Sequence, residues 1–453
     1  MKVDGLPNKN SKSPKPSLLP KDKYIPIRKK FYYSHAFALG WMLFSIWFSI
    51  PWVIDLGGLV SVPVALFVIV GLSYIPGYMN AFMVSSLLLD RQPALKVTHP
   101  AEEITILIAC RNEENGIGET IRYISLQDYQ GPINIIVIDN HSTDRTAEKA
   151  LEAGSDYNVN VKVIEEAKPG KNFALNAAIP HVETKWMITL DADTLLHKYA
   201  VRYIVASMLS APHDVCAVAG AVLVRNSRGR LLARTQEWDY FLGIASIKRL
   251  QGLFQGTLVA QGAFSIYKTE AVAQVGGWPD AIGEDIVLTW RFLGNGWKVY
   301  FEPLAVAFTE VPETFTHFFR QRSRWARGMI EALRVIKPWH QPLAYTKYLT
   351  GCNFVMPYID IVYTFVWLPG LVLAFFGSYW IVGMTTLLVL PLTLLQNSVL
   401  YRYQRNVFRV LELRIRKNVL GFFAYVLFYQ FIMSPVSVWG YFQEVFRAKR
   451  IWK

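Results

Sequence analysis

The sequence predicts an α/β domain with a mostly parallel sheet, held between two groups of membrane-spanning helices. The chain has 453 residues, is 52% hydrophobic and has a mean hydropathy of +0.23, which is too apolar for an ordinary soluble enzyme. Its longest apolar runs lie before residue 90 and beyond residue 350, whereas residues 90–345 have a globular composition. In this central part, short apolar runs alternate with helical stretches, which is typical of a parallel sheet covered on both faces.

The N-terminal part is expected to be a basic tail followed by two membrane helices. Residues 1–35 form the tail, whose first 30 residues carry nine Lys/Arg and two Asp. Within residues 36–89, the runs 36–54 and 59–89 are long enough to cross a bilayer and contain almost no charge. The first run follows a long polar stretch and lacks a small-x-small cleavage site, so we expect a retained anchor and not a signal peptide.

Residues 350–446 are expected to hold three or four further membrane segments, at roughly 354–377, 379–400 and 418–446. The last stretch is long for one crossing and short for two, and Pro435 interrupts it. Basic segments flank it on both sides: 401–417 has six basic residues and one Glu, and the C-terminal 447–453 has four basic residues. Both flanks are expected on the cytosolic side, which leaves the number of crossings open.

The charge distribution predicts the orientation of the chain in the plasma (inner) membrane. The net charge of +13 is concentrated in the three basic flanks, so it indicates contact with lipid head groups and not with nucleic acid. With a cytosolic N-terminus, two crossings return the chain to the cytosol for residues 90–345. The three cysteines lack metal-binding spacing, which agrees with a reducing compartment. We therefore expect a multi-pass membrane protein with a cytosolic domain.

Four apolar runs of the central part are expected to be strands, at residues 104–110, 133–140, 161–167 and 185–193. In such sheets, ligands bind at the carboxyl ends of the strands. Asp139 lies at one of these ends, and Asp191 and Asp193 lie at another. Residues i and i+2 of an extended chain project to the same side, so this pair would present two carboxylates to a cation or to a phosphate-bound metal. The alternative is that one of the two caps the next helix.

Other nucleotide-binding and metal-binding motifs are missing from the sequence. It contains no G-x-x-x-x-G-K-[ST] loop and no HExxH pair. Gly116 and Gly118 begin a dinucleotide-binding pattern, but Ile121 occupies the position of its third glycine. The pattern therefore favours a nucleotide whose diphosphate is neutralised by a divalent cation and not cradled by a glycine-rich loop.

Five motifs, in order, carry a resemblance to a known family: IDNHSTD (138–144), PGKNFALN (169–176), LDAD (190–193), GGWPDAIGEDIVLTWRF (276–292) and FRQRSRWARG (319–328). Together they resemble the processive family 2 glycosyltransferases, which include the synthases of cellulose, chitin, hyaluronan and poly-N-acetylglucosamine. The tract 302–328 is most similar to that of bacterial poly-β-1,6-N-acetylglucosamine synthases. The resemblance implies a Rossmann-like GT-A catalytic domain over residues 90–310.

The resemblance also implies a donor site for a UDP-sugar. Asp193 would be a ligand of Mg²⁺ or Mn²⁺, and Asp191 would face the ribose or a metal-bound water. Such an ion prefers oxygen ligands and takes several of them from phosphate and water. The resemblance also implies that Asp139 contacts the uracil and that Glu113 lies at the lip of the same pocket. Lys171 and Asn176 would lie near the nucleotide.

The remaining motifs are expected to serve the acceptor. Asp285, next to Glu284, is our candidate for the general base that deprotonates the acceptor hydroxyl; the alternative is an acidic first turn of a helix. Gln321, Arg324 and Trp325 occupy positions i, i+3 and i+4, so on a helix they share one face. Arginine can bind the diphosphate, and tryptophan offers a flat surface to a sugar ring. Residues 311–345, which carry these side chains, are expected to be amphipathic helices at the cytosolic membrane surface.

The chain departs from the family pattern at several positions near the donor pocket. Gly283 stands where a threonine is usual before Glu-Asp, and Asn140-His141 replaces the usual Asp-Gly turn. Ala109 and Arg111 replace a proline and an aromatic residue. None of these changes removes a catalytic carboxylate, and we expect His141 to be a turn residue and not a catalyst.

The expected function is a membrane synthase that polymerises N-acetylglucosamine from UDP-N-acetylglucosamine, with inversion, into an exported β-linked polysaccharide. The alternatives are a hyaluronan-type or chitin-type synthase and a transferase that adds one sugar to a lipid. A catalytically inactive scaffold and a transporter are disfavoured, because the three aspartates of the motifs are intact and the apolar segments carry almost no ionisable residues. The expected partners are the UDP-sugar, the growing polysaccharide and the bilayer, with room for a small membrane subunit.

Overall fold

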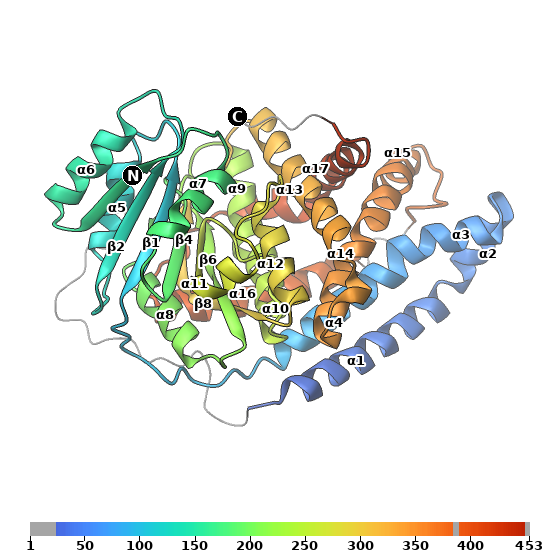
Figure 1. Cartoon of the computed structure of the whole chain (residues 1–453). Coiled ribbons are helices and arrows are strands. Elements are labelled where there is room, and N and C mark those ends of the chain that lie inside the picture. Colours follow the sequence, from blue (N-terminus) through green and yellow to red (C-terminus); the bar gives the residue numbers. More distant parts are fainter. Residues whose placement is uncertain (1–23, 384–388, 449–453) are drawn as a thin grey trace.

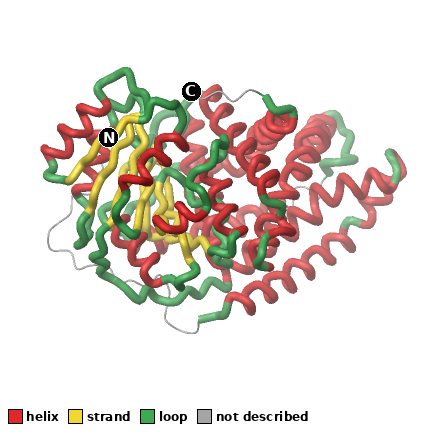
Figure 2. The backbone as a smooth tube through the Cα atoms, in the orientation of Figure 1, coloured by secondary structure: helices red, strands yellow, loops and turns green. Residues whose placement is uncertain are grey.

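A computed structural model of the chain describes residues 24–383 and 389–448 (Figure 1). Residues 1–23 of the expected basic tail and 449–453 of the basic C-terminus lie outside the described residues. Figure 2 shows strands gathered on one side of the molecule and long helices extending from it on the other. This separation agrees with the composition of the sequence, in which the globular part is enclosed between apolar segments.

The strands form one eight-stranded sheet in the order β3-β2-β1-β4-β7-β6-β8-β5. The four strands expected from the sequence are confirmed as β1 to β4, and their mutual pairings are parallel. The other half of the sheet is mixed, because β7 runs antiparallel to both β4 and β6. The bounds are β1 Ile104–Cys110, β2 Ile133–Asp139, β3 Asn160–Glu165, β4 Trp186–Leu190, β5 Leu195–Leu196, β6 Val215–Val224, β7 Phe264–Lys268 and β8 Lys298–Thr309.

Both faces of the sheet are buried under helices. Successive residues of a strand point to opposite faces, so Leu107 of β1 belongs to one apolar core while Ile106 and Ile108 belong to the other. Among the described residues, the helices of this domain and the segment that follows it are α5 Ile117–Ser125, α6 Thr146–Asp156, α7 Lys171–Ala178, η2 Ile179–His181, α8 Ala200–Ser210, α9 Leu231–Trp238, η3 Asp239–Ile244, α10 Ala245–Leu253, α11 Thr269–Gln274, α12 Glu284–Gly294, α13 Phe315–Val335 and η4 Pro338–His340.

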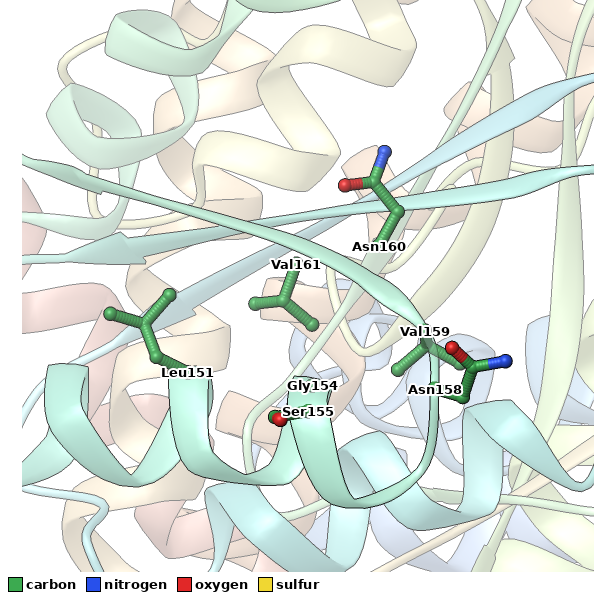
Figure 3. Close-up of a pocket in the computed structure, with 7 residues that line it drawn as sticks. All are labelled: Leu151, Gly154, Ser155, Asn158, Val159, Asn160 and Val161. Atoms are coloured by element: carbon green, nitrogen blue, oxygen red, sulfur yellow. The ribbon is translucent and has the colours of Figure 1, made fainter.

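A shallow surface hollow lies where α6 turns into β3 (Figure 3). Gly154 packs there against Val161, and a Cβ atom at Gly154 would lie only 2.8 Å from Cγ2 of Val161. Asn160, also in its lining, is the first residue of β3. The hollow therefore lies at the amino end of the strand, opposite to the carboxyl edge at which sheets of this kind bind ligands.

The apolar segments form long helices. Three of them are long and apolar enough to cross a membrane, and a bent helix pair raises the number to four within the described residues. The bend of 53° separates α1 from α2 and lies next to Pro51, which lacks the N–H needed to continue the first helix. The bounds are α1 Ile27–Phe48, α2 Ile50–Leu59, α3 Val62–Ile69, η1 Val70–Tyr74, α4 Ile75–Leu88, α14 Ala344–Val362, η5 Tyr363–Trp367, α15 Leu368–Phe375, α16 Val389–Val410 and α17 Val419–Val445.

Two expected membrane segments differ from the structure in detail. The segment expected at 36–54 is the bent pair α1–α2, whose helix already begins at Ile27. The apolar stretch 418–446 forms a single helix, α17, which continues through Pro435 over 27 residues. The segment expected at 379–400 lies partly outside the described residues, and α16 covers it only from Val389 onward.

A buried carboxyl in β8 makes the stability of the domain dependent on pH. Burial raises the pKa of Glu302 from an ordinary 4.5 to about 7, although the Leu304 N–H donates to its carboxylate at 3.0 Å. The folded chain therefore holds this proton more tightly than the unfolded chain, and stability falls as pH rises from 4.5 through 7.

We expect Glu302→Gln to flatten this pH dependence and to raise stability at pH 8 by up to about 3 kcal/mol, because the neutral amide needs no proton when buried. Melting temperatures of the detergent-solubilised protein between pH 4.5 and 8 would measure the effect. Glu183→Gln, at an exposed position, is the matched control. An unchanged melting profile in Glu302→Gln would contradict the expectation.

Candidate active site

The loops that follow β1 and β2 are joined by hydrogen bonds at the carboxyl edge of the sheet. The Asn112 Oδ1 accepts from the Thr143 N–H at 2.8 Å, and the Glu113 N–H donates to the Thr146 Oγ1 at 2.8 Å. Asp139 ends β2 opposite the end of β1, and its Oδ1 accepts from the Ser142 N–H at 3.1 Å. The structure thus brings Glu113 and Asp139, two of the expected donor-site residues, to the same edge.

Asn140 holds the loop that leads to Lys171. Its side chain is buried; its Nδ2 donates to the carbonyls of Glu166 and Lys168 at 3.0 and 2.7 Å, and its Oδ1 accepts from the Gly170 N–H at 2.7 Å. His141 follows with φ 60°, which confirms the expectation that it is a turn residue. An asparagine at position 140 therefore has a definite structural use.

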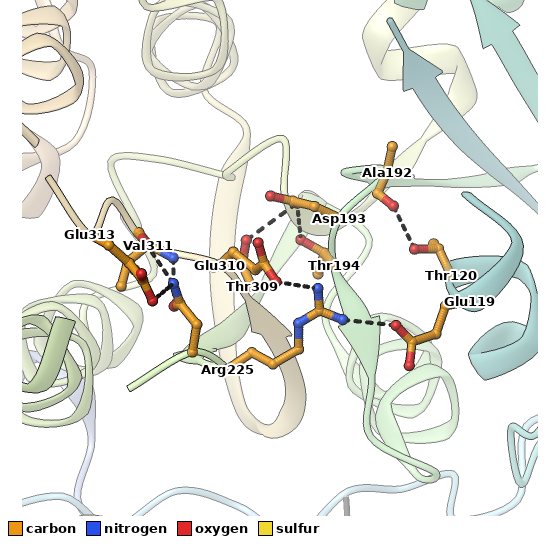
Figure 4. Close-up of polar contacts among 11 residues, drawn as sticks. Glu119, Thr120, Ala192, Asp193, Thr194, Arg225, Thr309, Glu310, Val311 and Glu313 are labelled. Carbon is orange, nitrogen blue, oxygen red and sulfur yellow. Dashed lines mark hydrogen bonds and ion pairs between the residues drawn. The ribbon is translucent and has the colours of Figure 1, made fainter. Parts of the chain in front are cut away.

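Asp191 and Asp193 follow β4 in a tight turn, in which the Thr194 N–H donates to the Asp191 carbonyl at 3.0 Å. The Asp191 carboxylate forms an ion pair with Lys171. The Asp193 Oδ1 accepts from the hydroxyls of Thr194 and Thr309 at 3.1 and 3.4 Å (Figure 4). The next helix, α8, begins only at Ala200, so the alternative interpretation of a helix cap is wrong for both aspartates.

Negative charge accumulates around Asp193. Burial raises the pKa of its carboxyl, and the Asp191 carboxylate raises it further. The pKa of Glu113 is also raised by burial and then by the charge of Asp193. Burial lowers the pKa of Lys171, but the carboxylates of Asp191 and Glu284 outweigh this effect and raise it overall. A cation bound at Asp193 would therefore relieve the repulsion among the carboxylates of Asp193, Asp191 and Glu113.

The residues present fit a divalent ion that takes few protein ligands. In the part of the chain that the structure describes, no group of three or more His, Cys, Asp or Glu side chains gathers to hold a metal by itself. Asp193, with Asp191 beside it, offers carboxylate oxygens at the edge of the sheet. A magnesium-type or manganese-type ion would complete its shell with phosphate oxygens and water.

A salt-bridged rim lies next to these aspartates. Figure 4 shows Arg225 between two carboxylates, with its guanidinium 3.1 Å from Glu119 and 2.7 Å from Glu310. The Thr120 hydroxyl donates to the Ala192 carbonyl at 2.6 Å and so fixes the residue between the two aspartates. No single sequence motif predicts this rim, because its members come from four separate segments.

Glu284 and Asp285 form the first turn of α12, so the structural interpretation of the motif is right, and it does not exclude a catalytic one. Glu284 is buried, and burial together with the neighbouring Asp285 charge raises the pKa of its carboxyl to about 7. The charges of Lys171 and Arg324 act in the opposite direction on Glu284. The electrostatic field of Lys171 therefore links the Asp191 side of the site to α12.

Asn176, expected near the nucleotide, bonds to the chain itself. Its Nδ2 donates to the Trp278 carbonyl at 2.8 Å, and its Oδ1 accepts from the Trp278 N–H at 2.8 Å. Gly277, directly before Trp278, has φ 71°, and a Cβ atom at Gly277 would lie 2.3 Å from the Asn176 Oδ1. The Asn176 side chain thus holds the loop that leads into α12.

The acceptor motif lies on α13, as expected from its spacing. Trp325 is 41% exposed and Arg324 is exposed, whereas Gln321 is half-buried. Arg322, which the sequence analysis did not select, is fully buried: its guanidinium lies 4.1 Å from the Trp325 ring centre and 3.0 Å from the Asp239 carboxylate. Its ion-pair partner Asp239 lies far away in the sequence, so no local pattern could have revealed this pairing.

Backbone contact joins α13 to the start of α12. A Cβ atom at Gly283 would lie 2.6 Å from the Gly328 Cα, and the Gly283 N–H donates to the Glu331 carboxylate at 3.1 Å. A threonine, usual at position 283 in the family that the motifs resemble, has no room against this partner. The departure noted in the sequence thus has a steric cause.

We expect Gly283→Ala to lower transfer activity by roughly 10-fold or more and to destabilise the protein by about 1–3 kcal/mol, because the new methyl group would push α13 away from Asp285. Gly118→Ala is the matched control, since a Cβ atom at that helical glycine meets only the Ala153 Cβ at 4.0 Å. Transfer rates and melting temperatures would be compared. Equal behaviour of the two variants would show that the contact is not tight.

Comparisons with known proteins agree with this geometry. The model of the family described as "Glycosyltransferase like family 2" matches residues 100–328. The poly-beta-1,6-N-acetyl-D-glucosamine synthase of Staphylococcus aureus is 33% identical over 246 residues, which are 54% of this chain and 58% of that protein. The synthase of the same name from Staphylococcus epidermidis is 31% identical over 262 residues, 57% of this chain and 63% of that protein.

Among solved structures, the mannosyltransferase PcManGT from Pyrobaculum calidifontis, in complex with GDP-Man and Mn²⁺, is similar in fold. The TM-score is 0.57 at 18% identity, and the match covers 84% of this chain and 99% of that one. The expected GT-A fold is thereby confirmed, flanked by apolar helices. The matches to the two staphylococcal synthases span about three fifths of the length of each.

Proposed function

The chain belongs to glycosyltransferase family 2, and from this premise we propose that it polymerises N-acetylglucosamine from UDP-N-acetylglucosamine into an exported β-linked polysaccharide. Support for the sugar comes from the two staphylococcal synthases, whose matched segments cover 54% and 57% of this chain. Support for a polymer comes from α13, which carries Gln321, Arg324 and Trp325 and whose Gly328 contacts Gly283, directly before α12.

The observation that carries the proposal is the meeting of two acidic groups of residues at one edge of the sheet. Asp191 and Asp193 come from the end of β4, whereas Glu284 and Asp285 come from α12, and the charge of Lys171 acts on both groups. With a divalent ion bound, the first group suits a sugar-nucleotide diphosphate, and the second suits an acceptor hydroxyl. This division of roles is what glycosyl transfer between a nucleotide donor and a sugar acceptor needs.

The proposed reaction is a single displacement. Asp285 takes the proton of the acceptor hydroxyl while the oxygen attacks C1 of the donor, and the bond from C1 to the diphosphate oxygen breaks. UDP leaves with the electron pair, and the configuration at C1 inverts, so that an α-linked donor gives a β-linked product. Because one carboxylate serves as base, no covalent nucleophile is required. A divalent ion, Mg²⁺ or Mn²⁺, held by Asp193 and Asp191 would supply charge compensation on the leaving diphosphate.

The chain's own residues supply the remaining contacts in this proposal. Asp139 and Glu113 border the nucleotide at the ends of β2 and β1, and Asn176 supports the loop that leads into α12. Trp325 offers its exposed ring to the acceptor sugar, supported from behind by Arg322. The catalytic domain would face the cytosol at the inner membrane, where the polymer enters the membrane helices, with or without a small partner subunit.

The test is to incubate the purified protein in nanodiscs with Mn²⁺ and radiolabelled UDP-N-acetylglucosamine as the only sugar, and to size the product. High-molecular-mass product that a poly-β-1,6-N-acetylglucosamine hydrolase degrades would support the proposal. Polymer that only chitinase degrades would indicate a chitin-type synthase. Polymer formed only after UDP-glucuronate is added would indicate a hyaluronan-type enzyme. A single sugar transferred to lipid, without polymer, would indicate a transferase that adds one sugar.

A further inference from the structure

The helix α17 presents a contradiction between composition and charge. It is 27 residues long and apolar enough to cross a membrane. Yet the segment before it is basic, and Arg447 begins another basic segment directly after it. A crossing would place one of these flanks on the side opposite to the catalytic domain, against the usual distribution of Lys and Arg.

The first end of α17 is bonded to the catalytic domain. The Trp238 Nε1 donates to the Asn418 carbonyl at 2.8 Å, and the Asn418 Nδ2 donates to the Glu237 carboxylate at 2.6 Å. Trp238 and Glu237 belong to α9, which follows β6 of the central sheet. The start of the helix is therefore fixed on the catalytic side.

The other end of α17 is bonded to the same body. The Glu444 carboxylate lies 2.7 Å from the Arg334 guanidinium and 3.2 Å from that of Arg327, and Arg327 also donates to the Ala448 carbonyl at 2.8 Å. Both arginines belong to α13, whose Gly328 touches the start of α12. The end of the helix is therefore fixed on the catalytic side as well.

Between its ends, α17 runs alongside α13, and the order of their contacts shows that the two helices run in the same direction. Phe318 packs on Tyr429, further along a Cβ atom at Gly440 would lie 2.5 Å from the Ser323 carbonyl, and Arg327 then reaches Glu444. The contact covers about four turns, or roughly 24 Å of α13. Two of the five arginines of α13, Arg320 and Arg324, are exposed, so it would be costly to place α13 in the hydrocarbon of a bilayer, and α17, which lies along it, is held at the same level.

The outward face of α17 nonetheless needs an apolar environment. Apart from Gln430, its exposed residues are apolar or aromatic, namely Val419, Leu420, Phe423, Leu427, Phe428, Trp439, Phe442 and Val445. A helix with one apolar outer face and basic flanks suits the boundary between head groups and acyl chains, where the flanks meet anionic lipid.

We propose that α17 does not span the membrane but lies in the membrane surface on the side of the catalytic domain, with its outer face docked into that leaflet. The crossings that remain after the catalytic domain are α14–α15 outward and α16 back, since Val407 and Leu411 of the returning segment pack into the core of the sheet. The basic segments on both sides of α17 then share the side of the catalytic domain. This inference does not depend on the sugar that the protein transfers.

The first test is single-cysteine labelling with a membrane-impermeant maleimide in sealed vesicles of one orientation. Arg447→Cys is expected to label from the same side as Asp156→Cys in the catalytic domain, and from the side opposite to Tyr379→Cys beyond α15. The chain without substitutions is the blank for its three native cysteines. Labelling of Arg447→Cys together with Tyr379→Cys would overturn the inference.

The second test measures depth with spin labels on the full chain in nanodiscs containing anionic lipid. Labels at Leu420, Phe428 and Val445 are expected to be equally shallow, with oxygen access greater than access of a polar nickel chelate. A label at Phe365 of η5 is the deep reference, because its side chain is exposed in the interior of the candidate span Ala344–Phe375. A depth at Phe428 equal to that at Phe365 would indicate a span. Low access of both reagents at all three positions would indicate a protein partner in place of lipid.

Discussion

Asp285→Asn is expected to lower polymer synthesis by roughly 10²–10⁴-fold while leaving UDP binding nearly unchanged, because the amide keeps the shape of the carboxylate but cannot accept the proton of the acceptor hydroxyl. Asp285 keeps one carboxylate oxygen bonded to the Ile286 N–H at 2.8 Å, and the amide oxygen can make the same bond. Initial rates at saturating donor, together with calorimetric titration of UDP and metal ion, would separate the two effects.

Glu270→Gln is the matched control for this variant. Glu270 is also an acidic residue in the first turn of a helix, α11, and it is exposed. It should keep the rate of the unsubstituted protein. If Asp285→Asn also kept that rate, Asp285 would not be the base, and the motif would have only the helix-starting role that its position in α12 already explains.

Asp193→Ala is expected to weaken metal-dependent binding of UDP by at least about 10²-fold, since even changes behind a metal ligand cost 10- to 100-fold in metal affinity. Burial and then the charge of Asp191 raise the pKa of Asp193, and a bound ion is expected to compensate this repulsion. Titration of UDP with Mn²⁺, and again with EDTA in place of the metal, would measure the difference between the two conditions. In the variant this difference should vanish.

Glu310→Gln provides the control for charge alone. Glu310 acts on the same carboxyl, but it is paired with Arg225 on the rim. Its loss should change binding by less than 10-fold, as expected for an exposed pair. If the variant without the Asp193 carboxylate still bound UDP with the original metal dependence, the ion would have to bind at another site.

The parts of the fold that could be predicted are those encoded in short segments. The strands β1 to β4 are apolar runs that end in polar residues, so both the parallel half of the sheet and the position of Asp139 and Asp193 at its edge followed from the sequence. The antiparallel strand β7 could not be placed, because its neighbours β4 and β6 are chosen by packing across the domain.

The same distinction holds for the site. The motif residues were found individually, but their mutual support was not: Asn140 bonding to Gly170 and Arg322 bonding to Asp239 join distant segments. Glycine at position 283 looked like a departure from a pattern, and only the closeness of Gly328 explains it. Such contacts depend on how elements approach each other, and no periodicity in the sequence records that distance.

The contact between Gly283 and Gly328 also constrains how the proposed polymer could advance. Where two backbones touch directly, no layer of side chains is left to slide or repack, so α12 and α13 behave as one stiff piece. In the proposed reaction, Asp285 on α12 and Trp325 on α13 would then keep a constant separation from one sugar addition to the next. Stepping of the product by one sugar would have to come from movement of the product itself, or of the loops around the nucleotide.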